Sequence, residues 1–149
     1  MLDSRLRPTF QMLRLVYGLV PIVAGLDKFT NLLTDWSAYL APWVASALPF
    51  SPEVFMRVVG VIEIAAGVLV LSKLTRVGAY VVSAWLVGIA LNLITSGRYL
   101  DVAVRDLVMA FGAFALAKLA EVRATESASE QAGAHTELRT SRASATARL

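Results

Sequence analysis

Cysteine is missing from this sequence of 149 residues, and histidine occurs once, as His135 in a polar C-terminal stretch. Without thiols the chain cannot form a disulfide, a thiolate metal site or a Cys-x-x-Cys redox centre. A single histidine outside the apolar part cannot hold a haem between imidazoles in a membrane, or build a His-rich zinc or iron site. We therefore expect no metal site, and no cofactor bound through cysteine or histidine.

Charged residues are also scarce, at 17%, whereas apolar residues reach 57%. A soluble domain has roughly 45–50% apolar residues. The excess lies almost entirely before Glu121, so that part of the chain is more apolar than the average suggests. The net charge of +3 comes largely from arginines beside the apolar stretches. Contact with anionic lipid headgroups accounts for it, and we expect no nucleic-acid binding.

Four apolar stretches are each close to the roughly 20 residues that a helix needs to cross a bilayer. They predict an all-α integral membrane protein, a four-helix transmembrane bundle, within residues 10–120. The expected spans are residues 10–29, 53–72, 76–96 and 102–120. The last two links are short, so consecutive spans there should be antiparallel neighbours.

The segment between the first two spans, residues 30–52, has a different composition. It contains Trp36 and Trp43, which suit the membrane–water interface. Its prolines rule out one long helix: Pro42, Pro49 and Pro52. We expect a short amphipathic helix lying on the membrane, followed by a turn.

The ends of the chain are polar. Residues 1–9 are predicted to form a cytoplasmic N-terminus. Residues 121–149 are rich in Ala, Ser, Thr, Glu and Arg and have few large apolar residues. Such a segment cannot bury enough surface to fold alone, so we predict a disordered cytoplasmic tail.

Lysine and arginine predict the orientation, because they are enriched in cytoplasmic loops. They occur in the N-terminus, the link between the second and third spans, and the tail: Arg5, Arg7, Lys73, Arg76, Arg123, Arg139, Arg142 and Arg148. Residues 30–52 have none, and the last link has only Arg98. Both termini are therefore predicted to be cytoplasmic.

Several polar side chains lie where lipid should be. At a rise of about 1.5 Å per residue, four of them from four spans fall at one level near the outer face: Lys28, Arg57, Asn92 and Asp106. Glu63 lies deeper and needs a partner on another helix, for which Tyr17, Lys28 and Asn92 are candidates. Asp27 and Arg105 lie near this cluster, with contact to headgroups as the alternative for both. Arg14 and Lys118 are expected to extend to the cytoplasmic headgroups.

This candidate polar cluster has two interpretations that the sequence leaves open. It is either a structural salt-bridge network that holds four helices in register, or a small outward-facing polar cavity. Such a cavity would bind a headgroup, a quinone or a small polar molecule, or pass a proton. The small residues that recur on one face of each span are explained by close helix packing.

The order of these residues resembles the DoxX family of small bacterial four-helix membrane proteins. Arg14 precedes L-x-x-G-L-x-x-I-x-x-G-L-D-K-F at residues 15–29, and V-G-x-I-E-I-A-A-G-V-L-V-L, T-R-V-G-A and R-D-L follow at residues 59–71, 75–79 and 105–107. The resemblance covers roughly residues 10–120. Its landmarks are Arg14, Gly18, Gly25, Lys28, Gly60, Glu63, Gly67, Arg76 and Asp106.

The resemblance implies a multi-pass protein of the bacterial inner (plasma) membrane. It also implies an accessory or scaffold subunit of a membrane-associated redox or stress-response system, without catalytic activity of its own. The alternatives are a quinone-interacting oxidoreductase subunit and a small-molecule or proton carrier that uses Glu63 and Asp106. Expected partners are the lipid bilayer and membrane redox proteins. A bound quinone and a homo-oligomer are left open.

Overall fold

A computed structural model describes residues 6–146, with side chains described up to residue 134 except at 127 and 130. Residues 1–5 and 147–149, and the side chain of His135, lie outside the described part. The described chain forms six helical elements and no strand: α1 (Leu6–Asp27), the 3₁₀ helix η1 (Trp36–Tyr39), α2 (Pro42–Ala47), α3 (Pro52–Leu71), α4 (Thr75–Ser96) and α5 (Leu100–Thr146). The prediction of an all-α fold is confirmed.

Three of these helices, α1, α3 and α4, are long and apolar enough to cross a membrane. They correspond to the first three predicted spans within a few residues. The fourth predicted span is the first part of α5, which carries Arg105, Asp106 and Lys118 among its apolar residues. Because of these charges α5 is not among the helices that composition alone marks as membrane-spanning. A fourth crossing therefore stays a prediction.

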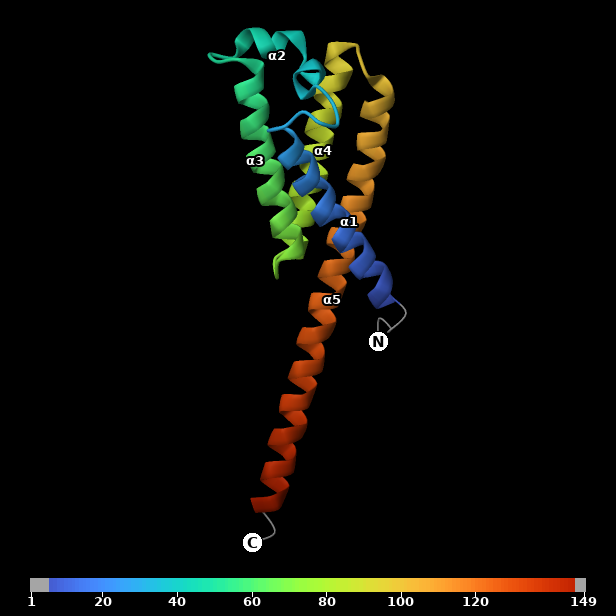
Figure 1. Ribbon diagram of the computed structural model, residues 1–149. Coiled ribbons are helices and arrows are strands. Elements are labelled where there is room, and N and C mark those ends of the chain that lie inside the picture. Colours follow the sequence, from blue (N-terminus) through green and yellow to red (C-terminus); the bar gives the residue numbers. More distant parts are fainter. Residues whose placement is uncertain (1–5, 147–149) are drawn as a thin grey trace.

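The long helices pack in pairs (Figure 1). Helix α1 packs along α3, helix α4 packs along α5, and α3 also contacts α4. Glycines make the α1–α3 contact close: a Cβ on Gly25 would lie 2.5 Å from the carbonyl oxygen of Gly60, and one on Gly60 would lie 2.6 Å from that of Gly25. Lipid offers no hydrophobic drive for helix association, so close backbone approach supplies van der Waals energy instead.

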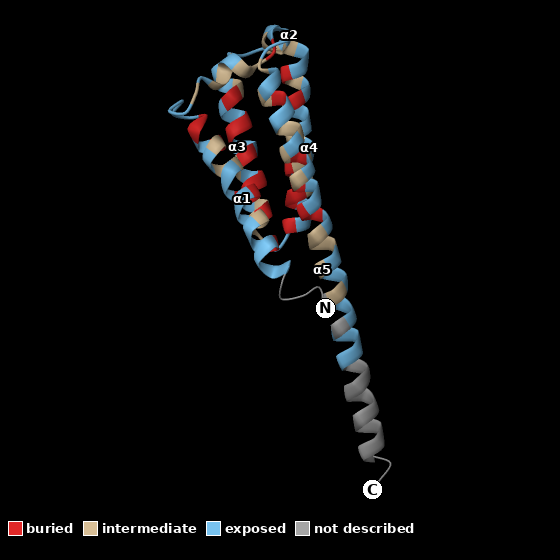
Figure 2. Ribbon diagram, turned by 90° about the vertical axis from the view of Figure 1, so that its right-hand side faces the viewer, coloured by how far each residue is buried: buried red, intermediate tan, exposed pale blue. Residues whose placement is uncertain are grey.

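Buried residues form narrow stripes that face the neighbouring helices, while the outer surfaces are apolar and exposed (Figure 2). The larger core cluster contains Tyr17, Val70, Ala79 and Leu116, and a smaller one contains Ala90, Leu93 and Ala103. Large side chains such as Leu15, Val23, Leu91 and Phe111 are more than half exposed. An apolar exterior around a core rich in small residues is the arrangement expected of helices in lipid.

The links place the polar features at two ends of the molecule. Gly97, in the left-handed conformation at φ 67°, ends α4 and lets the chain turn into α5. Ser51 accepts a hydrogen bond from the Val54 N–H, and with Pro52 it begins α3. The segment with η1 and α2 lies at the same end as the α4–α5 link, and the α3–α4 link lies at the opposite end (Figure 1).

The predicted interfacial segment contains two short helices, η1 and α2, rather than one. Ala41 between them is fully buried, whereas Trp43 in α2 is 59% exposed. Pro42 begins α2, where its missing N–H leaves no hydrogen bond unmade. Whether the segment lies at a membrane surface remains a prediction.

The tail differs from its prediction. Composition predicts disorder from about residue 121, whereas α5 continues as one helix to Thr146. The physical reason is local: residues 121–146 contain no Pro, and their Ala, Glu and Arg residues let the helix formed by the packed part propagate through the weaker helix formers Ser, Thr and Gly133. It extends well beyond the other helices (Figure 1).

Candidate functional site

The centre of the candidate site is an ion pair between α1 and α3. Lys28 Nζ lies 2.6 Å from Glu63 Oε2, and the two side chains are only 4% and 7% exposed. Lys28 follows the last residue of α1, and Gly60 lies one turn before Glu63. A Cβ on Gly60 would come within 3.1 Å of the Lys28 Cβ, so glycine there lets the lysine pass close to α3. Of the three residues predicted as candidate partners for Glu63, Lys28 is the one that forms the ion pair with it.

Two indole rings complete the surroundings of the pair. Trp85 Nε1 on α4 donates a hydrogen bond to Glu63 Oε1, with 3.4 Å between the atoms. The Lys28 ammonium lies 3.6 Å from the centroid of the Trp36 ring, in a cation–π contact. Both carboxylate oxygens of Glu63 are therefore engaged, and the charge of Lys28 faces a carboxylate and an aromatic ring.

Asp27 orients Trp36 and the loop that follows α1. Its carboxylate is buried at 6% exposure and accepts hydrogen bonds from the N–H groups of Leu32 and Leu33. It also accepts one from Trp36 Nε1 at 2.7 Å. Of the two possibilities for Asp27, the structure has the one near the cluster, because N–H groups of the loop and of Trp36 occupy both of its carboxylate oxygens. Sequence reasoning placed Asp27 near the cluster but missed its role in orienting Trp36, although its place beside Lys28 and Phe29 in the D-K-F motif could have indicated a role.

Asn92 performs a different task from the one predicted for it. Its Nδ2 donates to the Tyr39 carbonyl at 2.8 Å, and its Oδ1 accepts from the Ala41 N–H at 3.0 Å. The side chain therefore pairs with both backbone groups between η1 and α2, and holds that segment on α4. Asn92 therefore supports the segment that carries Trp36, and its hydrogen bonds go to that segment rather than to Lys28 or Glu63.

The other two members of the predicted cluster lie at its margin. Arg57 is exposed on α3, so the structure does not bring it into the buried cluster. Asp106 on α5 is half-buried, within electrostatic range of Lys28, Glu63 and its neighbour Arg105. The residues brought together are therefore Lys28 and Glu63, with Asp106 nearby. Two tryptophans join them: Trp36, which the sequence placed at the interface and not in the cluster, and Trp85.

At the opposite end, Arg14 joins α1 to the end of α3. Its Nε donates to the Val70 carbonyl at 3.2 Å, and its Nη2 donates to the carbonyls of Leu71 and of Ser72, the latter at 2.9 Å. The last carbonyls of a helix have no partner within it and carry partial negative charge, so a guanidinium suits them. Arg14 therefore caps α3 instead of extending to headgroups as expected.

A second polar contact lies at this end, between α4 and α5. Tyr80 donates its hydroxyl proton to Glu121 Oε1 at 2.9 Å, and Lys118 Nζ lies 2.9 Å from Glu121 Oε2. The hydrogen bonds from Lys118 and Tyr80 hold the pKa of the Glu121 carboxyl below its ordinary value. Lys118 thus pairs with a side chain of its own helix, one turn further along. The remaining family-motif position on α4, Arg76, is exposed.

The motif glycines lie along the α1–α3 contact between these two polar ends. Gly67 approaches the backbone of Gly18, about two helical turns away from the Gly25–Gly60 approach. Among the described residues, no group of three or more His, Asp or Glu side chains is placed to hold a metal ion. The chemistry that the site offers is that of one buried lysine–glutamate pair, bounded by two indoles.

Apolar helices around buried charges define a multi-helix integral membrane protein. The model of the DoxX family matches residues 9–95, which is more than half of the chain. The chain belongs to the DoxX family. The match includes Arg14, the motif glycines, Lys28, Glu63 and Arg76, whereas the R-D-L motif of α5 lies beyond it. Searches among curated proteins and among solved structures gave no match.

Proposed function

We propose that this DoxX-family protein is an accessory or scaffold subunit of a membrane-associated redox or stress-response system. It would cross the bacterial inner membrane four times, with both termini in the cytoplasm. The observation that carries the proposal is that the Lys28–Glu63 pair is closed: both side chains are almost fully buried and each charge is matched. A buried, satisfied pair fits a clasp between helices better than a site that admits substrate.

The closed pair bears on the two interpretations of the polar cluster. A carrier needs a group that exchanges protons or ligands with one side of the membrane. Glu63 instead has one oxygen on Lys28 and the other near the Trp85 indole. Truncating one member of such a pair leaves a buried charge unmatched, so the pair favours one helix arrangement over alternatives. This supports a structural role for Lys28 and Glu63, so a function is to be sought on the outer surfaces of the protein.

The extension of α5 supports a scaffold role. From residue 127 to Thr146 this helix continues beyond the packed part, and the side chains described there, at 128, 129 and 131–134, are exposed. A helix that projects from a membrane domain offers a partner an ordered surface at low entropic cost. We propose that it docks a cytoplasmic or membrane redox protein.

The test compares the full chain with a variant that ends at Glu126. This variant keeps the Tyr80–Glu121 contact and the packed part of α5. A second variant replaces residues 127–146 with a Gly/Ser linker of equal length, as a control for length. Each is purified in mild detergent from its native membrane, and the bound proteins are identified. We expect redox proteins with the full chain, and at least about a tenfold loss with both variants.

Two results would contradict the proposal at different points. If the same proteins remain bound to both variants, α5 is not the docking element. If the full chain brings down no redox or stress-response protein, and deletion of its gene leaves respiratory flux and oxidant tolerance unchanged, the accessory role itself is wrong.

A quinone-interacting subunit is the second candidate. It is supported by the two tryptophans that contact the Lys28–Glu63 pair, the ring of Trp36 at Lys28 and the N–H of Trp85 at Glu63, since aromatic side chains and a polar group together suit a quinone head. Organic extraction of the purified protein separates the candidates. Quinone at close to one molecule per chain, lost in a Trp36→Leu variant, would favour this role over the scaffold role.

A further inference from the structure

The link between α1 and η1, residues 28–35, lies deeper in the bundle than η1 and α2. Gly25 near the end of α1 meets Gly60 of α3. Gly60 follows Pro52, the first residue of α3, by about two helical turns, or roughly 12 Å. The link therefore leaves α1 well below the start of α3, and Figure 2 shows it projecting sideways below the level of α2.

Helix α3 provides a scale for this depth. Its 20 residues give a length of about 30 Å, which equals the thickness of the hydrocarbon core of a bilayer. The two ends of α3 therefore mark the two boundaries of the hydrocarbon where this helix crosses the membrane. Because α1 continues only to Asp27 after its contact at Gly25, the link begins roughly 8 Å inside the nearer boundary.

Backbone outside a helix is costly in hydrocarbon unless its polar groups have partners within the protein. Each N–H group from Lys28 to Leu33 has such a partner. The first four donate to carbonyls of the last turn of α1. Asn31 takes the left-handed conformation, at φ 51°, and the next two N–H groups, of Leu32 and Leu33, donate to the buried carboxylate of Asp27. These N–H groups thus face protein and need no water.

The side chains around the start of the link have the opposite arrangement to that of a loop in water. The charged residues Asp27 and Lys28 are turned inward, and each is only 6% exposed. The large apolar side chains are turned outward, with Leu32 84% and Leu33 69% exposed. Exposed leucines beside buried charges suit an apolar solvent, and they extend the apolar exterior of the helices.

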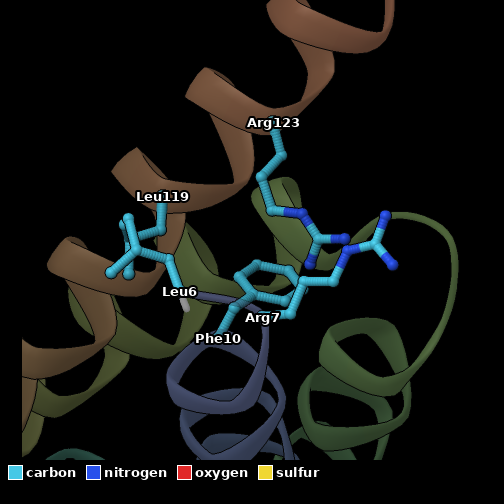
Figure 3. Close-up of a pocket in the computed structure, with 5 residues that line it drawn as sticks. All are labelled: Leu6, Arg7, Phe10, Leu119 and Arg123. Carbon is cyan, nitrogen blue, oxygen red and sulfur yellow. The ribbon is translucent and has the colours of Figure 1, made fainter. Parts of the chain in front are cut away.

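The other end of α1 has the side chains expected at a membrane–water boundary. Five side chains line a shallow hollow there, in which two arginines lie beside apolar groups (Figure 3): Leu6, Arg7, Phe10, Leu119 and Arg123. Long basic side chains next to apolar ones are typical of the headgroup level. Residues 26–34, all of which the structure describes, expose no charged side chain, so this stretch lacks that mark of the headgroup level. The first exposed charge after it is Asp35, which caps the start of η1.

We propose that the start of the link, residues 28–34, is embedded in the hydrocarbon of the leaflet nearest α2, with Leu32 and Leu33 in contact with lipid acyl chains. Asp27 permits this by accepting the N–H groups that water would hydrate in an exposed loop. The surface segment predicted for residues 30–52 then begins at Asp35. This inference rests on α1 and α3 crossing the membrane, and it is independent of the accessory role and of any partner of α5.

The test uses the full chain in vesicles of phosphatidylethanolamine and phosphatidylglycerol. Because the sequence contains no cysteine, Leu32→Cys and Leu33→Cys each accept a single nitroxide label. Electron paramagnetic resonance then measures collisions of the label with oxygen, which concentrates in hydrocarbon, and with an uncharged nickel chelate, which stays in water. Val58→Cys on α3 is the lipid-facing control, since Val58 is 50% exposed and lies at about the depth of the link. Ser129→Cys, at an exposed position of α5, is the water control.

We expect the ratio of oxygen to nickel collisions at both link positions to equal the ratio at residue 58. It should exceed the ratio at residue 129 at least about tenfold, because a polar chelate loses hydration when it enters hydrocarbon. Both leucines are largely exposed, so the labels displace no packed side chain, and circular dichroism verifies that the variants fold.

Two outcomes would overturn the proposal. A collision ratio at residues 32 and 33 equal to that at residue 129 would place the link in water. Few collisions with either reagent at both positions would show that protein, such as a second copy of this chain, covers the leucines instead of lipid.

A second measurement needs no label. Leu32→Asp should lower the midpoint of thermal unfolding in the same vesicles, because a carboxylate is costly in hydrocarbon. Ser129→Asp adds the same charge at an exposed position of α5 and should leave the midpoint unchanged. A midpoint that Leu32→Asp leaves unchanged or raises would contradict the embedded position, since aspartate in place of an exposed leucine is tolerated in water.

Discussion

At the scale of single residues, the buried Lys28–Glu63 pair is the feature with the largest energetic consequence. An ion pair that is removed from water loses the hydration free energy of both partners. Only close geometry and further hydrogen bonds offset this loss. Here three contacts offset the loss: the 2.6 Å ion pair, the hydrogen bond from the Trp85 indole and the contact with the Trp36 ring. The pair should therefore respond strongly when one partner is removed and weakly when both are.

We predict that Glu63→Gln, which leaves the Lys28 ammonium buried without a counter-charge, lowers the free energy of unfolding by about 3–5 kcal/mol. The double variant Lys28→Met with Glu63→Leu should recover most of this loss. Unfolding in mild detergent, followed by loss of helical circular dichroism, measures both. Arg57→Gln is the control, since Arg57 is an exposed charge on the same helix. A Glu63→Gln variant as stable as this control would show that the pair contributes nothing to the fold.

At the scale of elements, the contact between α1 and α3 depends on glycines at matched heights. The backbones meet at Gly25 and Gly60, and Arg14 holds the far end of α3 through its terminal carbonyls. In lipid, small residues at such crossings supply the association energy. The helices therefore differ in how far an added methyl group destabilises them. Gly25 on α1 and Gly88 on α4 allow a direct comparison.

We predict that Gly25→Ala destabilises the protein by about 1–3 kcal/mol, because its Cβ would lie 2.5 Å from the Gly60 carbonyl oxygen and force the helices apart. Gly88→Ala on α4 is the matched control. Nothing lies within 4 Å of a Cβ at Gly88, and alanine is the better helix former, so this change should be neutral or stabilising by up to about 1 kcal/mol. Thermal unfolding of both variants in the same detergent compares them. Equal effects would mean that α1 and α3 are not in close contact.

At the scale of the whole molecule, the polar features divide between two ends. The short helices η1 and α2 lie at one end, and the start of α1 and the α3–α4 link lie at the other (Figure 1). The proposed topology, with four crossings and cytoplasmic termini, would place the first set outside the cell and the second inside. Three crossings would place the C-terminal part of α5 on the opposite side from the N-terminus.

We predict that residue 46 is accessible from outside intact cells and that residue 129 is accessible only after lysis. Because the chain contains no cysteine, Ser46→Cys and Ser129→Cys each report without background when treated with a membrane-impermeant thiol reagent. Both native serines are exposed. Labelling of both residues from the same side would exclude the topology with four crossings.

Much of the fold follows from composition and periodicity alone. The apolar lengths predict the helices α1, α3 and α4, because a membrane-spanning helix must satisfy its backbone hydrogen bonds internally and therefore needs a long, uninterrupted apolar stretch. The glycine spacing on α1 and α3 indicates which faces pack, whereas Gly88 on α4 has no neighbour within 4 Å of an added Cβ. The lack of cysteine, and the place of the one histidine in the polar tail, rule out thiolate and imidazole chemistry within the apolar helices. The ordered motif from Arg14 to Arg76 indicates the family.

Only the tertiary structure decided which polar groups meet. Sequence distances place Lys28, Arg57, Asn92 and Asp106 at one level, but helix rotation and loop paths determine which of them face inward. The structure pairs Lys28 with Glu63, turns Arg57 outward, assigns Asn92 to the backbone beside Ala41, and brings in Trp36 through the buried carboxylate of Asp27. Depth along a helix is a one-dimensional property that the sequence contains, whereas the direction in which a side chain points among its neighbours depends on how all the helices pack.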